Sequence, residues 1–376
     1  MSENPTSGIA VHFSKLKDPR VPRTKLHDLH DILVIAICAI LCGADSWAHV
    51  AMFGEAKLAW FKTFLKLPYG IPSHDTFGRV FASLDVEAFA KCFQSWIESI
   101  ATLTKGEVVA IDGKTLRHTF DRAAEKLPIH MVSAWASANR LVLGQVQTEE
   151  KSNEITAIPK LLDLLSLKGC IVTIDAMGCQ KAIAAKIVEK EADYVLGLKG
   201  NQEKLHVDVE AYFHEALRCD FAGVTYSYHE KSEKGHGRVE TRRIWCTSDL
   251  GWCGVKPYWA GLRSIAMVES EREMNGKKSV EQRYYISSLD GRSARRFIKA
   301  TRSHWGIENQ VHWILDVAFR QDDARMRMGN AAANFAILEH IALNLLKSDK
   351  TVKVGVKGKR LNAGWDESYL LRLLGI

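Results

Sequence analysis

Hydrophobic patterning divides the chain at about residue 106. Before that point, apolar residues recur at helical spacing in Ile32–Leu41, in the amphipathic stretch Trp47–Leu65 and in Val86–Ile100. Turn signals separate these segments, among them Pro-Tyr-Gly-Ile-Pro at 68–72, and Ser73 precedes Phe77 as a helix start would. We therefore expect residues 1–100 to form an N-terminal helical domain.

After residue 106 short apolar strands alternate with helices. Val108–Asp112 and Cys170–Asp175 read as buried strands, and each ends on a carboxylate. Further strands are expected at 131–137, 141–148 and 193–198, and helices at 155–167, 180–191 and 202–217, the first opened by Ser152 and Asn153. The order β-β-β-α-β-α-β-α predicts an α/β fold over 101–220, with a ribonuclease H-like mixed sheet flanked by helices.

The pattern then becomes strand-rich again. Residues 221–290 are expected to form a β-strand insertion with strands at 242–247, 263–269 and 282–288. Residues 291–346 return to helical spacing and would complete the core with its final helices.

The first of these late helices has two chemically distinct faces. One face, expected to pack on the sheet, carries Glu308 with five other residues, Ala294, Phe297, Ile298, Thr301 and Trp305. The opposite face, called the basic face below, carries five cations and no acid: Arg292, Arg295, Arg296, Lys299 and Arg302.

Three carboxylates emerge as candidates for a shared site. Asp112 and Asp175 finish adjacent strands, where ligands of parallel sheets gather, and Glu308 would lie on the helix above them. Hard cations such as Mg²⁺ prefer oxygen ligands, and two such ions can support in-line displacement at phosphorus. Three converging acids would also repel one another without a cation. The combination predicts a metal-dependent phosphodiester-cutting site.

Simpler roles are open for each acid. An aspartate at a strand end before glycine is commonly a turn or helix cap, and a glutamate in a polar helix is usually solvated. Asp316, Asp322 and Asp323 are rivals for the third ligand, and Asp316 follows Glu308 by little more than two helical turns.

Charge and cysteine content narrow the class of protein. Residues 291–376 hold 15 Lys and Arg against 8 Asp and Glu, which accounts for the net charge of +7 of the whole chain. This surplus suits either a polyanion-facing surface or a solvated one.

Eight scattered cysteines without a Cys-x-x-Cys pair favour a reducing cytoplasm over a zinc site or disulfides, and Ile32–Ala44 is too short to cross a membrane. A cytoplasmic location, at the nucleoid when bound to DNA, is expected.

Other cations could contact a polyanion, but each also has a plainer interpretation. Lys114 and Arg117 follow Asp112 and would otherwise be solvated turn residues. The loop Lys199–Gln202 could hold a phosphate on its backbone amides or be a plain turn capped by Asn201. His236 and Arg238 would lie at a hairpin tip, while Trp305 and Trp313 are expected in the core rather than as base-stacking platforms.

The last segment, 347–376, is expected to be a basic C-terminal tail. Lys347–Arg360 holds six cations against the single acid Asp349. A flexible arm for the DNA backbone and a disordered solubilising segment are equally compatible with this composition.

Long motifs in a fixed order make the chain resemble the DDE transposase group that includes the H-repeat-associated proteins of Rhs elements. The resemblance runs from about residue 10 to 346. Its motifs are FSKLKDPR (13–20), AICAILCGADSW (36–47), GIPSHDTFGRVFASL (70–84), AIDGKTLR (110–117), KSNEITAIP (151–159), VTIDAMGCQ (172–180), ADYVLGLKGNQ (192–202), GHGRVE (235–240) and HWGIENQVHWILDVAFRQDD (304–323).

The resemblance implies specific roles and partners. Asp112, Asp175 and Glu308 would be the metal-binding triad, with Mg²⁺ or Mn²⁺ as cofactor. The partners would be double-stranded DNA, as element ends and target, and a second copy of the chain in a synaptic complex. The wider group often has Tyr, Arg and Lys around its glutamate, where this chain has Thr301, His304 and Leu315. Arg302 or His312 could substitute in contacting phosphate.

Three functions are therefore open. The first is an active DNA transposase that cuts element ends and joins the 3′-hydroxyl to target DNA. The second is an inactive or domesticated DNA-binding relative, and the third is a nuclease that hydrolyses without joining. The three acids are all present, which favours the first.

Overall fold

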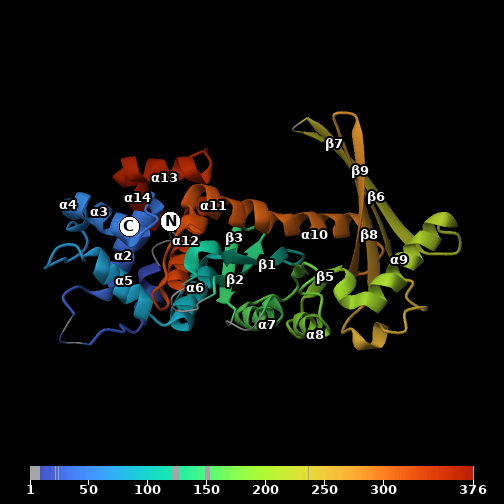
Figure 1. The fold of residues 1–376 in the computed structure, drawn as a ribbon, viewed down its shortest axis with the longest axis horizontal. Helices are drawn as coiled ribbons and strands as arrows, with labels where there is room; N and C mark the ends of the chain where they lie inside the picture. Colours follow the sequence, from blue (N-terminus) through green and yellow to red (C-terminus); the bar gives the residue numbers. More distant parts are fainter. Residues whose placement is uncertain are drawn as a thin grey trace.

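The computed structural model describes residues 9–21, 23, 25–120, 127–148, 153–235 and 237–375. His236, Ser152 and the start of the KSNEITAIP motif lie outside these ranges. Figure 1 shows an elongated molecule with a helical end, a central sheet and an arm of long strands at the other end. The long helix α10 (Ala294–Ile307) runs between the arm and the helical end.

The N-terminal segment is helical, as its periodicity predicts. The Ser73 hydroxyl accepts a hydrogen bond from the Thr76 amide at 3.3 Å, so the predicted helix start is a side-chain cap. Helix α2 is buried along nearly its whole length and forms the centre of this end. No helix in the described part of the chain is both long and apolar enough to span a bilayer. The helices are α1 (Ile9–Phe13), α2 (Leu29–Leu41), α3 (Trp47–Ala56), α4 (Leu58–Phe61), α5 (His74–Ser83) and α6 (Val86–Ile100).

The central sheet has the predicted ribonuclease H-like topology. Its strands lie in the order β3-β2-β1-β4-β5, in which β1 is parallel to β4, β4 is parallel to β5 and the hairpin β2-β3 is antiparallel. The predicted fold class, a mixed sheet flanked by helices, is confirmed. The elements are β1 (Val108–Leu116), β2 (Ile129–Ala136), β3 (Leu141–Gln147), α7 (Glu154–Leu164), β4 (Ile171–Ile174), α8 (Lys181–Glu189), β5 (Asp193–Leu198) and α9 (Glu203–Arg218).

The β-strand insertion continues the same sheet. Strand β9 pairs antiparallel with β5, and β8, β7 and β6 follow outward, so the described residues form one sheet of nine strands. Strand β6 escaped sequence prediction because most of its residues are polar and exposed. The strands are β6 (Tyr226–Gly235), β7 (Arg238–Thr247), β8 (Ser264–Met274) and β9 (Lys277–Ser287).

The apolar face of α10 packs on the sheet as expected, with one exception. Phe297, Ile298 and Thr301 are buried, but Trp305 is 39% exposed and Trp313 is 60% exposed. The expectation that both tryptophans belong to the core is wrong: Trp305 lies against the Arg283 guanidinium, and Trp313 is largely exposed. The helix continues through a π-helical turn, Glu308–His312, into α11 (Trp313–Phe319).

The C-terminal segment is neither a flexible arm nor disordered, so both expectations for it are wrong. After α12 (Ala331–Ser348), it forms α13 (Val356–Trp365) and α14 (Glu367–Leu374). Lys359 and Arg360 are buried, and the Arg360 guanidinium donates to the Ile40 carbonyl at 2.7 Å and to the Ala44 carbonyl at 3.3 Å. The cations of this segment therefore hold the two ends of the chain together.

Candidate active site

The strands β1 and β4 bring the two candidate aspartates to the same place. Ile111 pairs with Ile174 in parallel register, and Asp112 and Asp175 are the next residue on each strand. Strand β1 continues to Leu116 instead of ending at Gly113, because β2 pairs with it along this stretch. The Asp175 carboxylate accepts a hydrogen bond from the Met177 amide at 3.0 Å, so this residue does form the turn contact that its simpler interpretation predicts.

The π-helical turn positions the third acid. Glu308 begins this turn, and its side chain lines a pocket of about 260 Å³ together with Asp175. Lys199, His304 and Arg283 contribute to the same pocket. A π-helical turn widens the helix by one residue and is frequent at functional sites.

The three carboxylates influence one another electrostatically. Burial raises the pKa of Asp112 to about 7, and the neighbouring charge of Glu154 adds to this rise. Asp175 and Glu308 raise the same pKa further. Burial also raises the pKa of Glu308, against the opposing effect of the Arg283 guanidinium. Such mutual repulsion is what a bound cation would relieve.

Two histidines of the late helix pack beside the acids. His312 Nδ1 lies 3.6 Å from Asp112 Oδ2, and burial lowers the pKa of His312 to about 4, with further lowering by Lys114. His304 Nδ1 lies 3.1 Å from Thr173 Oγ1, and burial lowers the pKa of His304 as well. Both imidazoles are therefore neutral at pH 7.

A pair of side chains that sequence reasoning missed lies beneath the end of β1. His130 Nε2 and Glu154 Oε1 are 2.8 Å apart, and the His130 Nδ1 is 2.9 Å from Thr115 Oγ1. A Cβ atom on Gly113 would come within 2.2 Å of the Glu154 carboxylate and 2.3 Å of the His130 ring. The glycine that follows Asp112 is therefore needed for close packing. The contact arises because β2 carries His130 and α7 carries Glu154 to the same place, so the sequence alone does not predict it.

The rival acids are engaged elsewhere. The Lys114 ammonium donates to Asp316, and it lies 3.3 Å from Asp322, which also faces Arg117. Asp323 pairs instead with Arg320 at 3.0 Å. Lys114 is mostly buried within β1, so its interpretation as a solvated turn residue is wrong.

The basic face of α10 is only partly available for a polyanion. Arg302 lies 2.7 Å from Glu233 of β6, Arg296 lies 3.7 Å from Asp193, and Arg292 pairs with Asp290. Arg295 and Lys299 are exposed. The insertion strands thus cover a face that the sequence alone predicts to be open.

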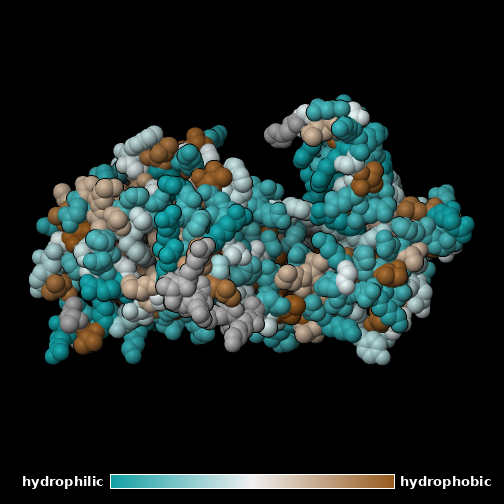
Figure 2. Space-filling model, viewed as in Figure 1, coloured by the Kyte–Doolittle hydropathy of each residue, from teal (hydrophilic) through white to brown (hydrophobic). Residues whose placement is uncertain are grey.

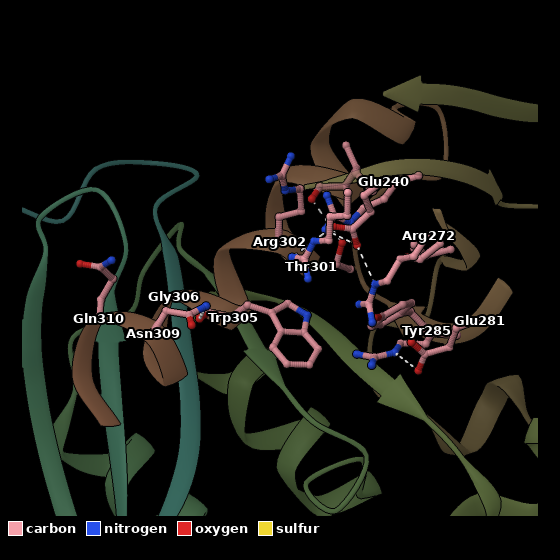
Figure 3. Close-up of a pocket in the computed structure, with 16 residues that line it drawn as sticks. Glu240, Arg272, Glu281, Tyr285, Thr301, Arg302, Trp305, Gly306, Asn309 and Gln310 are labelled. Carbon is pink, nitrogen blue, oxygen red and sulfur yellow. Dashed lines mark hydrogen bonds and ion pairs between the residues drawn. The ribbon is translucent and has the colours of Figure 1, made fainter. Parts of the chain in front are cut away.

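A second, larger groove of about 460 Å³ adjoins the first pocket, between α10 and the insertion strands. We call it the arginine groove; its cations are Arg238, Arg242, Arg272, Arg283 and Arg302. Figure 3 shows Arg302 and Trp305 of α10 on one side and Glu240, Arg272 and Tyr285 of the strands on the other. In Figure 2 an open notch bordered mainly by hydrophilic residues lies between the projecting strand ends and the helical end.

Buried Glu240 organises the guanidinium groups of the arginine groove. Its carboxylate lies 2.6 Å from Arg242, 3.1 Å from Arg272 and 3.8 Å from Arg238. Arg242 also lies 3.2 Å from Glu233. Because the five arginines that line the groove outnumber its two lining acids, Glu240 and Glu281, the groove keeps a positive surplus. Arg238 starts β7 directly after the hairpin tip, as predicted.

The loop 199–202 follows β5 and leads into α9 as expected. Asn201 is not a helix cap, however, because its side-chain amide donates to the Ala176 carbonyl at 2.6 Å. This bond ties the loop to the turn after Asp175, and it places Lys199 at the edge of the pocket that Asp175 and Glu308 share.

The donor atoms suit a hard divalent cation, but they are not preassembled around one. Carboxylate oxygens are the ligands that Mg²⁺ and Mn²⁺ prefer. Among the residues that the structure describes, no three His, Cys, Asp or Glu side chains converge closely enough to hold an ion. Asp112 and Asp175 are adjacent by strand register, and Asp175 and Glu308 line one pocket, so Asp175 is the acid that connects the other two.

The fold, together with the family model that matches most of the chain, defines the class of the protein as an enzyme of the nuclease and transposase type. The chain belongs to the DDE transposase family. The family model described as "Transposase DDE domain" matches residues 103–345, and the one described as "DDE_Tnp_1-associated" matches residues 10–97.

Relatives of nearly the same length carry transposase names. The chain is 44% identical over 367 residues to "Putative transposase YncI" of Escherichia coli O157:H7, covering 96% of this chain and 93% of that protein. It is 40% identical over 368 residues to "H repeat-associated putative transposase YhhI" of E. coli strain K12, covering 96% of each. A shorter relative is "Inactive transposase YbfQ" of E. coli strain K12, which is 41% identical over 69 residues. This match covers 18% of this chain and 82% of that protein.

Proposed function

We propose that this protein is an active DNA transposase that cuts the ends of an insertion element and joins the freed 3′-hydroxyl to target DNA. The observation that carries the proposal is the adjacency of Asp112, within β1, and Asp175, directly after the parallel strand β4, with Glu308 lining the same pocket as Asp175. These three carboxylates would hold Mg²⁺ or Mn²⁺. Bound divalent ions would activate the attacking oxygen and stabilise the leaving one.

The reaction has two phosphodiester steps of the same kind. In cutting, a water oxygen bonds to phosphorus while the bond to the 3′ oxygen breaks, which leaves a 3′-hydroxyl and a 5′-phosphate. In joining, that 3′ oxygen bonds to a target phosphorus while the target's own 3′ oxygen leaves and takes up a proton. Neither step consumes an oxidant or an external energy source.

The arginine groove is the proposed path of the DNA next to this site. Arg238, Arg302 and Lys199 lie along the groove and the adjoining pocket, and clustered cations bind phosphate with release of counterions. Contacts by Lys114, Arg117 and the rest of the basic face are part of the same proposal. Because two element ends must be joined together, we further propose a homodimer in the synaptic complex, acting at the nucleoid of the cytoplasm.

The proposal is tested by incubating the protein with Mg²⁺ or Mn²⁺ and duplexes taken from the sequences that flank its gene. Wild type should yield strand-transfer products, and Asp175→Asn should lower their rate at least about 100-fold because the variant loses a metal-ligand charge. Asp220→Asn, a surface change after α9, is the matched control. Hydrolysis without joined products would indicate a nuclease, and no cutting by wild type would indicate an inactive relative.

A further inference from the structure

We propose that Arg283, on insertion strand β9, contacts the scissile phosphate. It supplies the guanidinium that the late helix does not offer to the pocket of Asp175 and Glu308. This inference rests on the proposed function. Arg283 lines both the pocket of Asp175 and Glu308 and the arginine groove, so it stands where DNA would pass from one to the other. Nothing in its local sequence, a polar alternating strand, singles it out.

Three neighbours hold the Arg283 side chain in place. Its Nε donates to Glu281 Oε1 at 2.8 Å, its guanidinium lies 4.8 Å from the centre of the Trp305 ring, and Tyr285 is a further hydrogen-bond partner. Stacking on an aromatic face orients the planar guanidinium, whose geometry suits phosphate oxygens. The exposed Trp305, which the sequence alone assigns to the core, thus acquires a role at the site.

Arg283 lines the pocket of Asp175 together with His304 and Glu308 of the late helix. A cation of the insertion therefore lies at the same pocket as the proposed third acid.

Arg302 and His312, the other residues considered for this role, do not line the pocket of Asp175 and Glu308. Arg302 is held by Glu233 at 2.7 Å and lines only the arginine groove, and the neutral His312 lies against Asp112. At the positions where the wider group has Tyr and Lys, Thr301 and Leu315 are buried, and the Thr301 hydroxyl donates to the Ile298 carbonyl. The late helix therefore offers no guanidinium to the pocket from these positions, whereas β9 does.

A guanidinium at this position would stabilise the transition state of phosphoryl transfer. During phosphoryl transfer, negative charge is spread over the non-bridging oxygens, and a fixed guanidinium can donate to two of them. A donor that is already positioned stabilises the transition state more than the ground state. Its loss should therefore slow bond cleavage more than it weakens DNA binding.

The test compares Arg283→Gln and Arg283→Lys with Arg263→Gln, which removes an exposed cation just before β8, away from both the pocket and the groove. Single-turnover cutting of duplexes from the gene's flanks is measured at saturating protein with Mg²⁺, beside binding of the same duplexes by fluorescence anisotropy. We expect Arg283→Gln to cut about 100-fold more slowly than wild type. Its Kd should change by no more than about threefold, because one phosphate contact is a small part of the electrostatic binding.

Each outcome bears on the inference. Partial recovery of the cutting rate in Arg283→Lys, which keeps the charge but not the planar guanidinium, supports the inference. If thermal unfolding shows that Arg283→Gln is misfolded, the cutting rate of Arg283→Lys is compared with that of wild type instead. Cutting by both Arg283 variants at the rate of Arg263→Gln overturns the inference, as does an equal loss of Kd and rate. Failure of wild type to cut contradicts the proposed function itself, and this inference with it.

Discussion

Asp112 and Gly113 show how closely the site residues depend on their neighbours. The apolar run before Asp112 is enough to predict a buried strand that ends in a carboxylate. The packing of Glu154 and His130 against Gly113 could not be predicted, because it joins residues from three separate elements.

This packing leads to a first prediction. In Gly113→Ala the new Cβ would overlap the Glu154 carboxylate and the His130 ring, so we expect the free energy of unfolding to fall by about 1–3 kcal/mol. Urea denaturation measures this loss. The variant Gly254→Ala, at a glycine with open space around it, should stay near wild type. If Gly113→Ala costs as much in a His130→Ala/Glu154→Ala background as in wild type, the overlap is not the cause.

A second residue-scale prediction concerns Glu339 of α12. This side chain is fully enclosed, and burial raises its pKa to about 8, although Gln321 donates to it at 2.5 Å and Arg360 is nearby. The folded state therefore holds a proton that the unfolded state releases above about pH 4.5, so this contribution to stability is complete below that pH and is lost as pH rises towards 8.

Glu339→Gln should accordingly remove a decline of at most about 1.4 kcal/mol per pH unit between pH 5 and 8. The measurement is urea denaturation of both proteins at each pH, since contributions of the other groups cancel in the difference. Parallel curves for wild type and variant would show that Glu339 is not protonated in the folded protein.

At the scale of elements, prediction from sequence succeeds where burial follows the local pattern. It fails where tertiary contacts determine whether a segment is buried or paired. The strands of the central sheet are apolar and could be predicted, whereas β6 is polar and is held by its neighbours in the sheet. Trp305 and Trp313 are exposed, whereas Ile307 between them is buried, because each residue occupies a different side of the late helices. Their hydrophobicity alone could not show this.

The C-terminal helices show that charged residues, too, can be buried where the local sequence predicts exposure. The row of cations in 347–360 resembles a solvated tail, yet Arg360 donates to carbonyls of residues more than 300 positions away. These carbonyls lie at and just after the end of α2, where the regular hydrogen bonds of the helix stop, and the guanidinium donates to both. No local pattern encodes such a contact.

We predict that Arg360→Ala lowers the free energy of unfolding by at least about 3 kcal/mol, because charged hydrogen bonds to buried carbonyls are lost. Lys357→Ala, at an exposed position of the same helix, should cost less than about 0.5 kcal/mol. Equal stability of the two variants in chemical denaturation would show that α13 does not hold the helical end together.

At the scale of the whole molecule, one sheet connects the insertion to the acids. Strand β9 joins β5 directly, so Arg283 and the arginine groove are held rigidly beside the pocket of Asp175 and Glu308. The sequence predicts the ribonuclease H-like core and the presence of an insertion. It does not predict that the insertion covers part of the basic face of α10, because the ion pair of Arg302 with Glu233 links residues far apart in the chain.

The central claim is that Asp112, Asp175 and Glu308 act as one metal site, although the described residues show no preassembled cluster. The most direct measurement is Mn²⁺ binding, followed by electron paramagnetic resonance in the presence of a flanking-sequence duplex, for wild type and for Asp112→Asn, Asp175→Asn and Glu308→Gln. We predict that each single variant weakens Mn²⁺ binding at least about tenfold, while Asp220→Asn binds as wild type does. Wild-type Mn²⁺ affinity in Glu308→Gln would contradict the account, because the third acid would then be no part of the site.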